Sequence, residues 1–221
     1  MKLFNKLRQF FGNYDYRRRA SGIDRNKKTV NIEDAQKIGL LYLVPDERSY
    51  EKIVDFIKNL QKQGKKVFAL GFVMNKDVPS FFSSSNSYSF FTLKDLNWYN
   101  KPRSTFVTNF LNEKFDLVIN LSLEDIFPLQ YISGLSKANM RVGKYGEDNG
   151  QYYDMMIETD KINDLGSYIE QIAHYLSIIK NKSGLNDIPS KNQKKVFSYV
   201  ESKVDNYMGM YDLLFDLVTL F

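Results

Sequence analysis

Continuous apolar runs alternate with amphipathic segments through the middle of the chain. Residues 38–44, 67–73 and 115–121 are almost wholly apolar, which is typical of strands that are buried on both faces of a parallel sheet. Between the first two runs, apolar residues from Tyr50 to Leu60 recur at helical spacing, and Ser49 is placed to cap this helix. The order strand, helix, strand is a βαβ unit and predicts parallel pairing.

A second unit of the same kind follows further along the chain. The apolar run 115–121 leads through a short predicted helix over 128–138 to a buried strand at 140–143. Additional elements are predicted as an edge strand at 88–92, a helix at 104–113, a strand at 152–158 and a helix at 162–180. We therefore predict an α/β fold: a single three-layer Rossmann-like domain over 38–180 with a mainly parallel sheet.

Two extensions flank this domain. Residues 1–37 read as a basic N-terminal helix and connector, with apolar residues at helical spacing over 2–11 and a helix end at Gly12 and Asn13. Residues 181–221 read as a linker and a C-terminal helical extension, whose last twelve positions are rich in large apolar side chains. Such an apolar segment has to be covered, so we expect it to pack on the domain or on a partner.

Charge is distributed unevenly along the chain. Residues 1–28 contain nine Lys or Arg and two Asp, a net charge of +7, so the remaining residues carry −2 of the overall +5. The arm has three interpretations: its aromatic face packs on the domain, it lies on an anionic membrane, or it contacts RNA. The residues expected to meet a polyanion or a membrane are Arg17, Arg18, Arg19, Lys27 and Lys28.

Composition removes several chemistries. The chain has no cysteine and one histidine, which excludes disulfides, thiolate metal ligands and cysteine nucleophiles. Gly-x-Gly-x-x-Gly, Gly-Lys-Ser/Thr and Gly-x-Ser-x-Gly are all absent. His174 falls beside the apolar stripe of a predicted helix, and we interpret it as a partly buried packing residue. We expect no catalytic residue, metal site or cofactor, and the sequence favours a protein that is not an enzyme.

An alternative site follows from the predicted sheet. Ligands of open α/β sheets bind outside the carboxyl ends of the strands, where a topological switch point opens a crevice. The candidate ligand-binding residues at those ends are Asp46, Asn120, Ser122 and Glu124. If the strands before them are neighbours, Asp46 and Glu124 are the first pair to test for magnesium. The competing interpretation is that these loops are ordinary solvated turns.

Several segments carry a resemblance to known families. They are the basic N-terminal helix, 38–44, 94–98, 115–119, 136–143 and 153–157. In this order along the chain, they are similar to the pattern of an uncharacterised family of small Bacteroidetes proteins, a domain of unknown function. This resemblance covers roughly residues 1–180 and implies a single Rossmann-like domain without a known activity.

A fainter similarity, carried by 116–119 and 141–143, links the chain to the N-terminal half of heptosyltransferase-like glycosyltransferases. Those enzymes bind the sugar nucleotide mainly through a second domain, and this chain is too short to contain one.

These observations lead to two hypotheses of function. The first is a non-catalytic binding or scaffold protein acting through the basic arm and the apolar C-terminal helix, with a protein partner or self-association at that helix. The alternative is a glycosyltransferase-like or nucleotide- or phosphosugar-binding protein with its site at the strand ends. We expect a cytoplasmic protein without a transmembrane segment, and leave open a position peripheral to the inner membrane.

Overall fold

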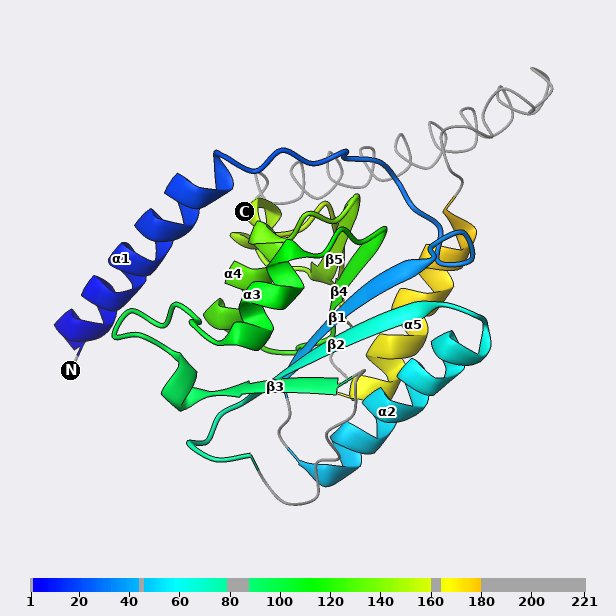
Figure 1. Cartoon of the computed structure of the whole chain (residues 1–221), viewed down its shortest axis with the longest axis horizontal. Helices are drawn as coiled ribbons and strands as arrows, with labels where there is room; N and C mark the ends of the chain where they lie inside the picture. The colour runs from blue at the N-terminus through cyan, green and yellow to red at the C-terminus, as the bar shows by residue number, and fades with distance from the viewer. Residues whose placement is uncertain (1, 44–45, 79–87, 160–163, 180–221) are drawn as a thin grey trace, which may run out of the picture. The chain divides into compact units, whose positions relative to one another are not determined.

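The computed structural model describes residues 2–43, 46–78, 88–159 and 164–179. These residues form an α/β domain around a six-stranded sheet in which every neighbouring pair of strands is parallel. The strands lie in the order β3-β2-β1-β4-β5-β6, and the first five are labelled in Figure 1. The predicted Rossmann-like α/β fold is confirmed, and the predicted C-terminal helical extension, 181–221, lies outside the described residues.

The elements follow the predicted order closely. In the part of the chain described, the strands are β1 (Lys37–Leu43), β2 (Lys66–Val73), β3 (Tyr88–Thr92), β4 (Leu117–Asn120), β5 (Met140–Lys144) and β6 (Met155–Ile157). The helices are α1 (Lys2–Ala20), α2 (Glu47–Lys62), α3 (Thr105–Asn112), α4 (Phe127–Leu135) and α5 (Leu165–Ile178), with short 3-10 turns η1 (Leu93–Asp95) and η2 (Asn149–Gln151). The last strand is shorter than predicted because residues 152–154, at its expected start, form a turn after η2.

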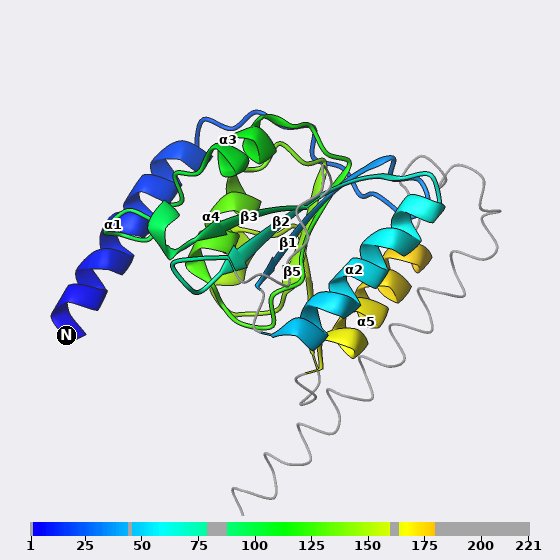
Figure 2. The same ribbon diagram turned by 60° about the horizontal axis from the view of Figure 1, so that its bottom comes forward.

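Two apolar layers enclose the sheet. Alternating strand positions point to opposite faces, so Leu40 packs with α2 and α5 whereas Leu41 packs with α3 and α4. Figure 2 shows α2 and α5 on one side of the sheet and α3 and α4 on the other. Both faces of the central strands are therefore buried, which explains their nearly continuous apolar sequence.

The chain reverses its direction of progress across the sheet between β1 and β4. It first adds β2 and β3 on one side of β1, and then returns to place β4 on the other side of β1. Leu41 pairs with Asn120 in this register, so the loops that follow β1 and β4 leave the same edge of the sheet. This edge is the topological switch point.

Helix α1 forms an additional layer outside α4, and it is longer than the sequence predicted. The expected end at Gly12 and Asn13 is wrong, because the helix continues to Ala20. Gly12 instead permits close packing: a Cβ at this position would lie 2.9 Å from Cζ of Phe127 and 3.1 Å from the carbonyl oxygen of Tyr99. The glycine is therefore a contact point rather than a helix stop.

The connector after α1 crosses the amino ends of the strands and joins both helical layers. The Lys28 amide donates to the carbonyl of Asn139, and the Ile32 amide donates to the carbonyl of Leu176 in α5. The Arg25 guanidinium binds both carboxylate oxygens of Asp154, at 2.5 and 2.6 Å. Residues 21–36 are thus held along the domain by main-chain bonds and by a nearly buried ion pair.

Candidate functional site

A cavity of about 770 Å³ opens at the switch point. It is bordered by the loops after β1 and β4 and by the first turns of α2 and α5. Its charged lining residues are Asp46, Arg48, Lys52, Glu124, Asp125, Lys144 and Asp164. Because β1 and β4 are neighbours, the structure brings Asp46 and Glu124 to one cavity, as the magnesium hypothesis required.

The aspartates at the mouth of this cavity are helix caps. Asp46 accepts hydrogen bonds from the Ser49 amide at 2.9 Å and from the Ser49 hydroxyl at 2.8 Å, and these bonds lower its pKa. The predicted cap Ser49 is therefore wrong, since Asp46 caps α2 and Ser49 is the donor. Asp164 caps α5 in the same way, and its hydrogen bonds from Lys52 and from the Ser167 amide lower its pKa to about 2.

The remaining candidates from β4 are also bound within the protein. The side-chain amide of the buried Asn120 donates to the Tyr153 hydroxyl at 2.7 Å, and its oxygen accepts from the main-chain amide of Ser122 at 3.1 Å. The Ser122 hydroxyl donates to the carbonyl of Glu124 at 2.8 Å. Asp46, Ser122 and Glu124 line the cavity, whereas Asn120 is engaged beside it with Tyr153 and Ser122.

These contacts define what the switch-point cavity offers chemically. Lys52 is paired with Asp164 at 2.5 Å, and Lys144 donates to the carbonyl of Leu123 at 2.7 Å. Across the described ranges, no three histidine, aspartate or glutamate side chains form a group that could hold a metal ion. The lone histidine, His174, is exposed on α5, so its interpretation as a partly buried packing residue is wrong. The side chains of Asp46, Lys52, Ser122, Lys144 and Asp164 are thus engaged in helix caps, an ion pair and loop bonds.

Helix α1 is seated on α4 by a buried carboxylate. Asp15 accepts from the Tyr131 hydroxyl at 2.6 Å and from Nε of Arg19 at 3.0 Å, and Lys101 lies 3.2 Å away. Burial alone would raise the pKa of Asp15, but the hydrogen bonds from Tyr131 and Lys101 outweigh it and lower the pKa. An ionised Asp15 therefore anchors the C-terminal half of α1.

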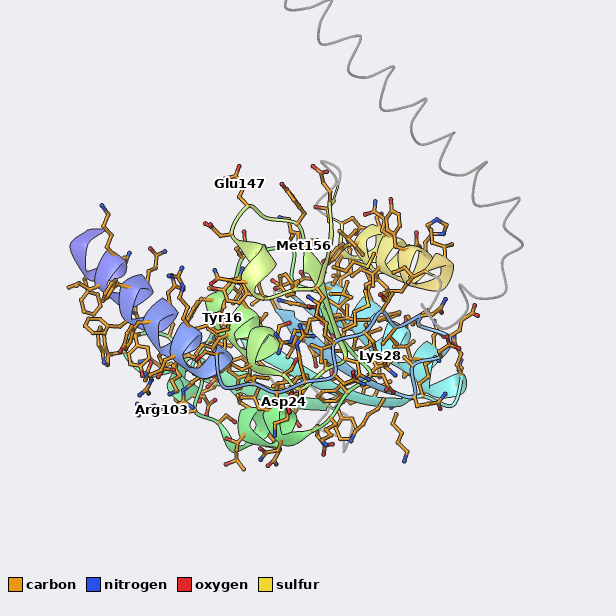
Figure 3. The ribbon with its side chains drawn as sticks, turned by 90° about the horizontal axis from the view of Figure 1, so that it is seen from above. Tyr16, Asp24, Lys28, Arg103, Glu147 and Met156 are labelled. Carbon is orange, nitrogen blue, oxygen red and sulfur yellow. The ribbon has the colours of Figure 1, made fainter. Side chains whose placement is uncertain are left out.

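Tyr16, next to Asp15, also anchors α1 to the domain. We call the contacts of Gly12, Asp15 and Tyr16 the seat of α1. Tyr16 is 2% exposed and donates to the carbonyl of Gln151 at 2.6 Å. Its ring lies 4.8 Å from that of Tyr152 and 6.1 Å from that of Tyr131, measured between centroids. In Figure 3 Tyr16 lies where α1 meets the domain, while Glu147 points outward at the tip of a loop.

The five cations predicted to contact a polyanion do not form one free patch. Arg18 and Arg19 lie 3.7 and 3.0 Å from the carboxylate of Asp15. Lys27 lies 2.9 Å from Asp154. Arg17 and Lys28 are exposed, on α1 and on the connector respectively. Carboxylates thus compensate three of the five.

Five large apolar residues of α1 are exposed to solvent. The helix packs through Gly12, Asp15 and Tyr16, so the interpretation in which its aromatic face packs on the domain is wrong for most of that face. Phe10 is 64% exposed, the highest value among the large apolar side chains described. The exposed apolar residues on α1 are Phe4, Leu7, Phe10, Phe11 and Tyr14.

Trp98 extends this surface, and sequence reasoning missed it. Trp98 is 49% exposed, and its ring centroid lies 5.2 Å from that of Phe11. Arg8 on α1 holds the loop in place by donating to the carbonyl of Trp98 at 2.7 Å and to the side-chain oxygen of Asn100 at 3.0 Å. We call Phe4, Leu7, Phe10, Phe11, Tyr14 and Trp98 the aromatic face. Its two parts are ninety residues apart, so no local sequence signal joins them.

A second cavity, of about 810 Å³, is lined by residues of α1, of α4 and of the loop after β5. Arg8 and Arg17 are among the α1 residues that line it. Among its lining residues, Gln130 and Asn149 are buried and both donate to the carboxylate of Asp125, at 3.0 and 2.8 Å. This polar cluster joins the start of α4 to the loop after β5.

Fold and surface together define a Rossmann-like α/β domain with an appended, partly exposed helix. The chain belongs to a family of unknown function, DUF6913, whose pattern matches residues 8–179. That match includes the seat of α1 on α4 and all six strands. No curated protein and no solved structure matches this chain. In the described residues, no helix is both long enough and apolar enough to cross a membrane.

Proposed function

We propose that this protein is a non-catalytic binding protein whose interaction surface is the aromatic face of α1 and the Trp98 loop. The observation that carries the proposal is the direction of this face. Five large apolar side chains of one helix point to solvent, although the same helix is firmly seated through its other face. Exposed apolar side chains gathered in this way usually mark a binding surface.

The seat of α1 supports this function because it holds the helix and the Trp98 loop in place before binding. Asp15, Tyr16 and Gly12 fix the second half of the helix, and Arg8 fixes the loop that carries Trp98. A surface that is already ordered loses little conformational entropy when it binds.

The proposal can be tested by photo-cross-linking in living cells. A benzophenone amino acid at position 10 should form adducts with a cellular macromolecule or lipid. The matched control is position 106, because Phe106 is 51% exposed but lies on α3. Equal labelling from both positions, or no adduct at position 10, would refute the proposal.

A second candidate function is a nucleotide- or phosphosugar-binding protein related to the heptosyltransferase-like glycosyltransferases. The location of the first cavity at the switch point, with Asp46, Ser122 and Glu124 on its lining, favours it. The internal hydrogen bonds of Asp46 and Ser122 weigh against it, because a ligand would have to replace them. A thermal shift with a panel of sugar nucleotides that Glu124→Gln removes would support this function.

Three predictions from the sequence concern the setting of this function and remain predictions. They are a Bacteroidetes origin, a cytoplasmic location, and a protein partner or self-association at residues 181–221.

A further inference from the structure

We propose that the aromatic face binds an anionic lipid bilayer, with α1 lying in the plane of the headgroups. This inference rests on the proposed function, because it names the partner of the same surface. A bilayer would accept the face without needing a complementary groove.

The arrangement of side chains along α1 fits this orientation. Phe4, Leu7, Phe11 and Tyr14 follow one another at intervals of three and four residues, so they share one side of the helix. Phe10 widens this stripe on one flank. A helix with such a stripe and few apolar residues elsewhere lies in a membrane interface instead of crossing it.

The first half of α1 is also free to approach a flat surface. Figures 1 and 2 show the N-terminal turns of α1 extending beyond α4 and the sheet, and the packed residues Gly12, Asp15 and Tyr16 belong to later turns. Trp98 lies beside Phe11, at the border between this exposed half and the domain. Tryptophan is the residue enriched at the headgroup level of membranes.

Charge selects the lipid type and disfavours RNA. Lys6 and Arg17 are exposed cations that flank the stripe. An anionic headgroup layer attracts such cations near the surface. RNA binding needs several uncompensated cations along a phosphate backbone, whereas Asp15 and Asp154 already compensate Arg18, Arg19 and Lys27.

Vesicle flotation of the full-length protein tests the inference. Vesicles of phosphatidylcholine and phosphatidylglycerol should carry the protein, vesicles of phosphatidylcholine alone should carry much less, and high salt should weaken binding. The double variant Phe4→Ser/Phe10→Ser should bind about tenfold more weakly or worse, because both phenyl rings leave the interface. The control Phe106→Ser removes an exposed phenyl ring from α3 and should bind like wild type.

The same flotation assay tests the contribution of charge with single variants of exposed cations and a control. Lys6→Gln and Arg17→Gln should each weaken binding about fivefold, which corresponds to about 1 kcal/mol for each cation near an anionic surface. The control Lys62→Gln removes an exposed cation from α2, on the opposite side of the sheet, and should have no effect. Thermal unfolding of every variant confirms that the fold is retained.

Several outcomes would overturn the inference, and they separate it from the proposed function. Absence of wild-type binding to the anionic vesicles overturns it, as does equal binding of the Phe4→Ser/Phe10→Ser variant. Gel-shift binding of a structured RNA in place of vesicles, lost in the same variant, would refute the lipid partner while the aromatic face remained an interaction surface. Adducts at position 10 that contain only protein would have the same meaning.

Discussion

Replacing Gly134 by alanine should loosen the seat of α1. Gly134 lies in α4, and a Cβ at this position would lie 2.5 Å from the hydroxyl oxygen of Tyr16 and 2.6 Å from its Cε2. Ordinary contact begins at 3.4 Å, so the tyrosine ring has to retreat by about 1 Å. It has little room to do so, because it is buried against Tyr152 and bonded to the carbonyl of Gln151.

The size of the effect follows from three contributions. Forcing an extra methyl group into a packed contact costs about 1–3 kcal/mol. Weakening the hydrogen bond from Tyr16 to Gln151 costs about 1 kcal/mol more. Alanine in place of glycine inside a helix returns about 0.5–1 kcal/mol. We therefore expect Gly134→Ala to lower the free energy of unfolding by about 1–3 kcal/mol.

Urea unfolding and hydrogen exchange check this prediction together. The matched control is Gly150→Ala, because the nearest heavy atom to a Cβ at Gly150 is 4.0 Å away, and its free energy of unfolding should be nearly unchanged. Amides of α1 should exchange faster in Gly134→Ala, while amides of β1 should stay protected. A Gly134→Ala variant as stable as wild type, or one whose α1 amides exchange at the wild-type rate, would refute this account of the seat.

Three further predictions concern single groups. Asp154→Asn should cost about 3 kcal/mol of unfolding free energy by leaving Arg25 nearly buried without an anion. Burial opposes ionisation of Asp154, but hydrogen bonds from Arg25 and Lys27 lower its pKa. Asp154 therefore contributes fully to the free energy of unfolding above a pH of about 4, and this contribution is lost below it. In acid, urea midpoints should fall more steeply for wild type than for the variant. Asp46→Ala should lower the thermal midpoint because the cap of α2 is lost, and Mg²⁺ should not change the midpoint of the wild type. A Mg²⁺-dependent rise that this variant abolishes would instead make Asp46 a metal ligand. Tyr42→Phe should leave the urea midpoint unchanged or raise it, because the Tyr42 hydroxyl is buried without a hydrogen-bond partner in the described residues, and a clear loss of stability would contradict that reading.

The fold could be predicted because its signals are local. Parallel strands buried on both faces require continuous apolar runs, and the helices between them require apolar residues at helical spacing. The sequence could not establish that β1 and β4 are neighbours; the structure shows that they are, so Asp46, Ser122 and Glu124 line one cavity, whereas Asn120 lies beside it.

Predictions from the sequence were wrong where the structure depends on contacts between segments that are distant along the chain. Gly12 resembled a helix stop, because its close approach to Phe127 and Tyr99 is invisible in the sequence. The pairing of Lys27 with Asp154 is likewise invisible in the sequence, because the two residues lie far apart along the chain. Residues that assemble across about a hundred positions leave no periodic pattern to read.

Fluorescence of Trp98 tests the central claim most directly, because it is the only tryptophan in the chain and lies within the aromatic face. Its emission should shift to shorter wavelength when vesicles containing phosphatidylglycerol are added. Lipids brominated near the headgroup end of the acyl chain should then quench it. Unchanged emission, with no quenching by brominated lipid at any depth, would contradict the proposal that this face binds a membrane surface.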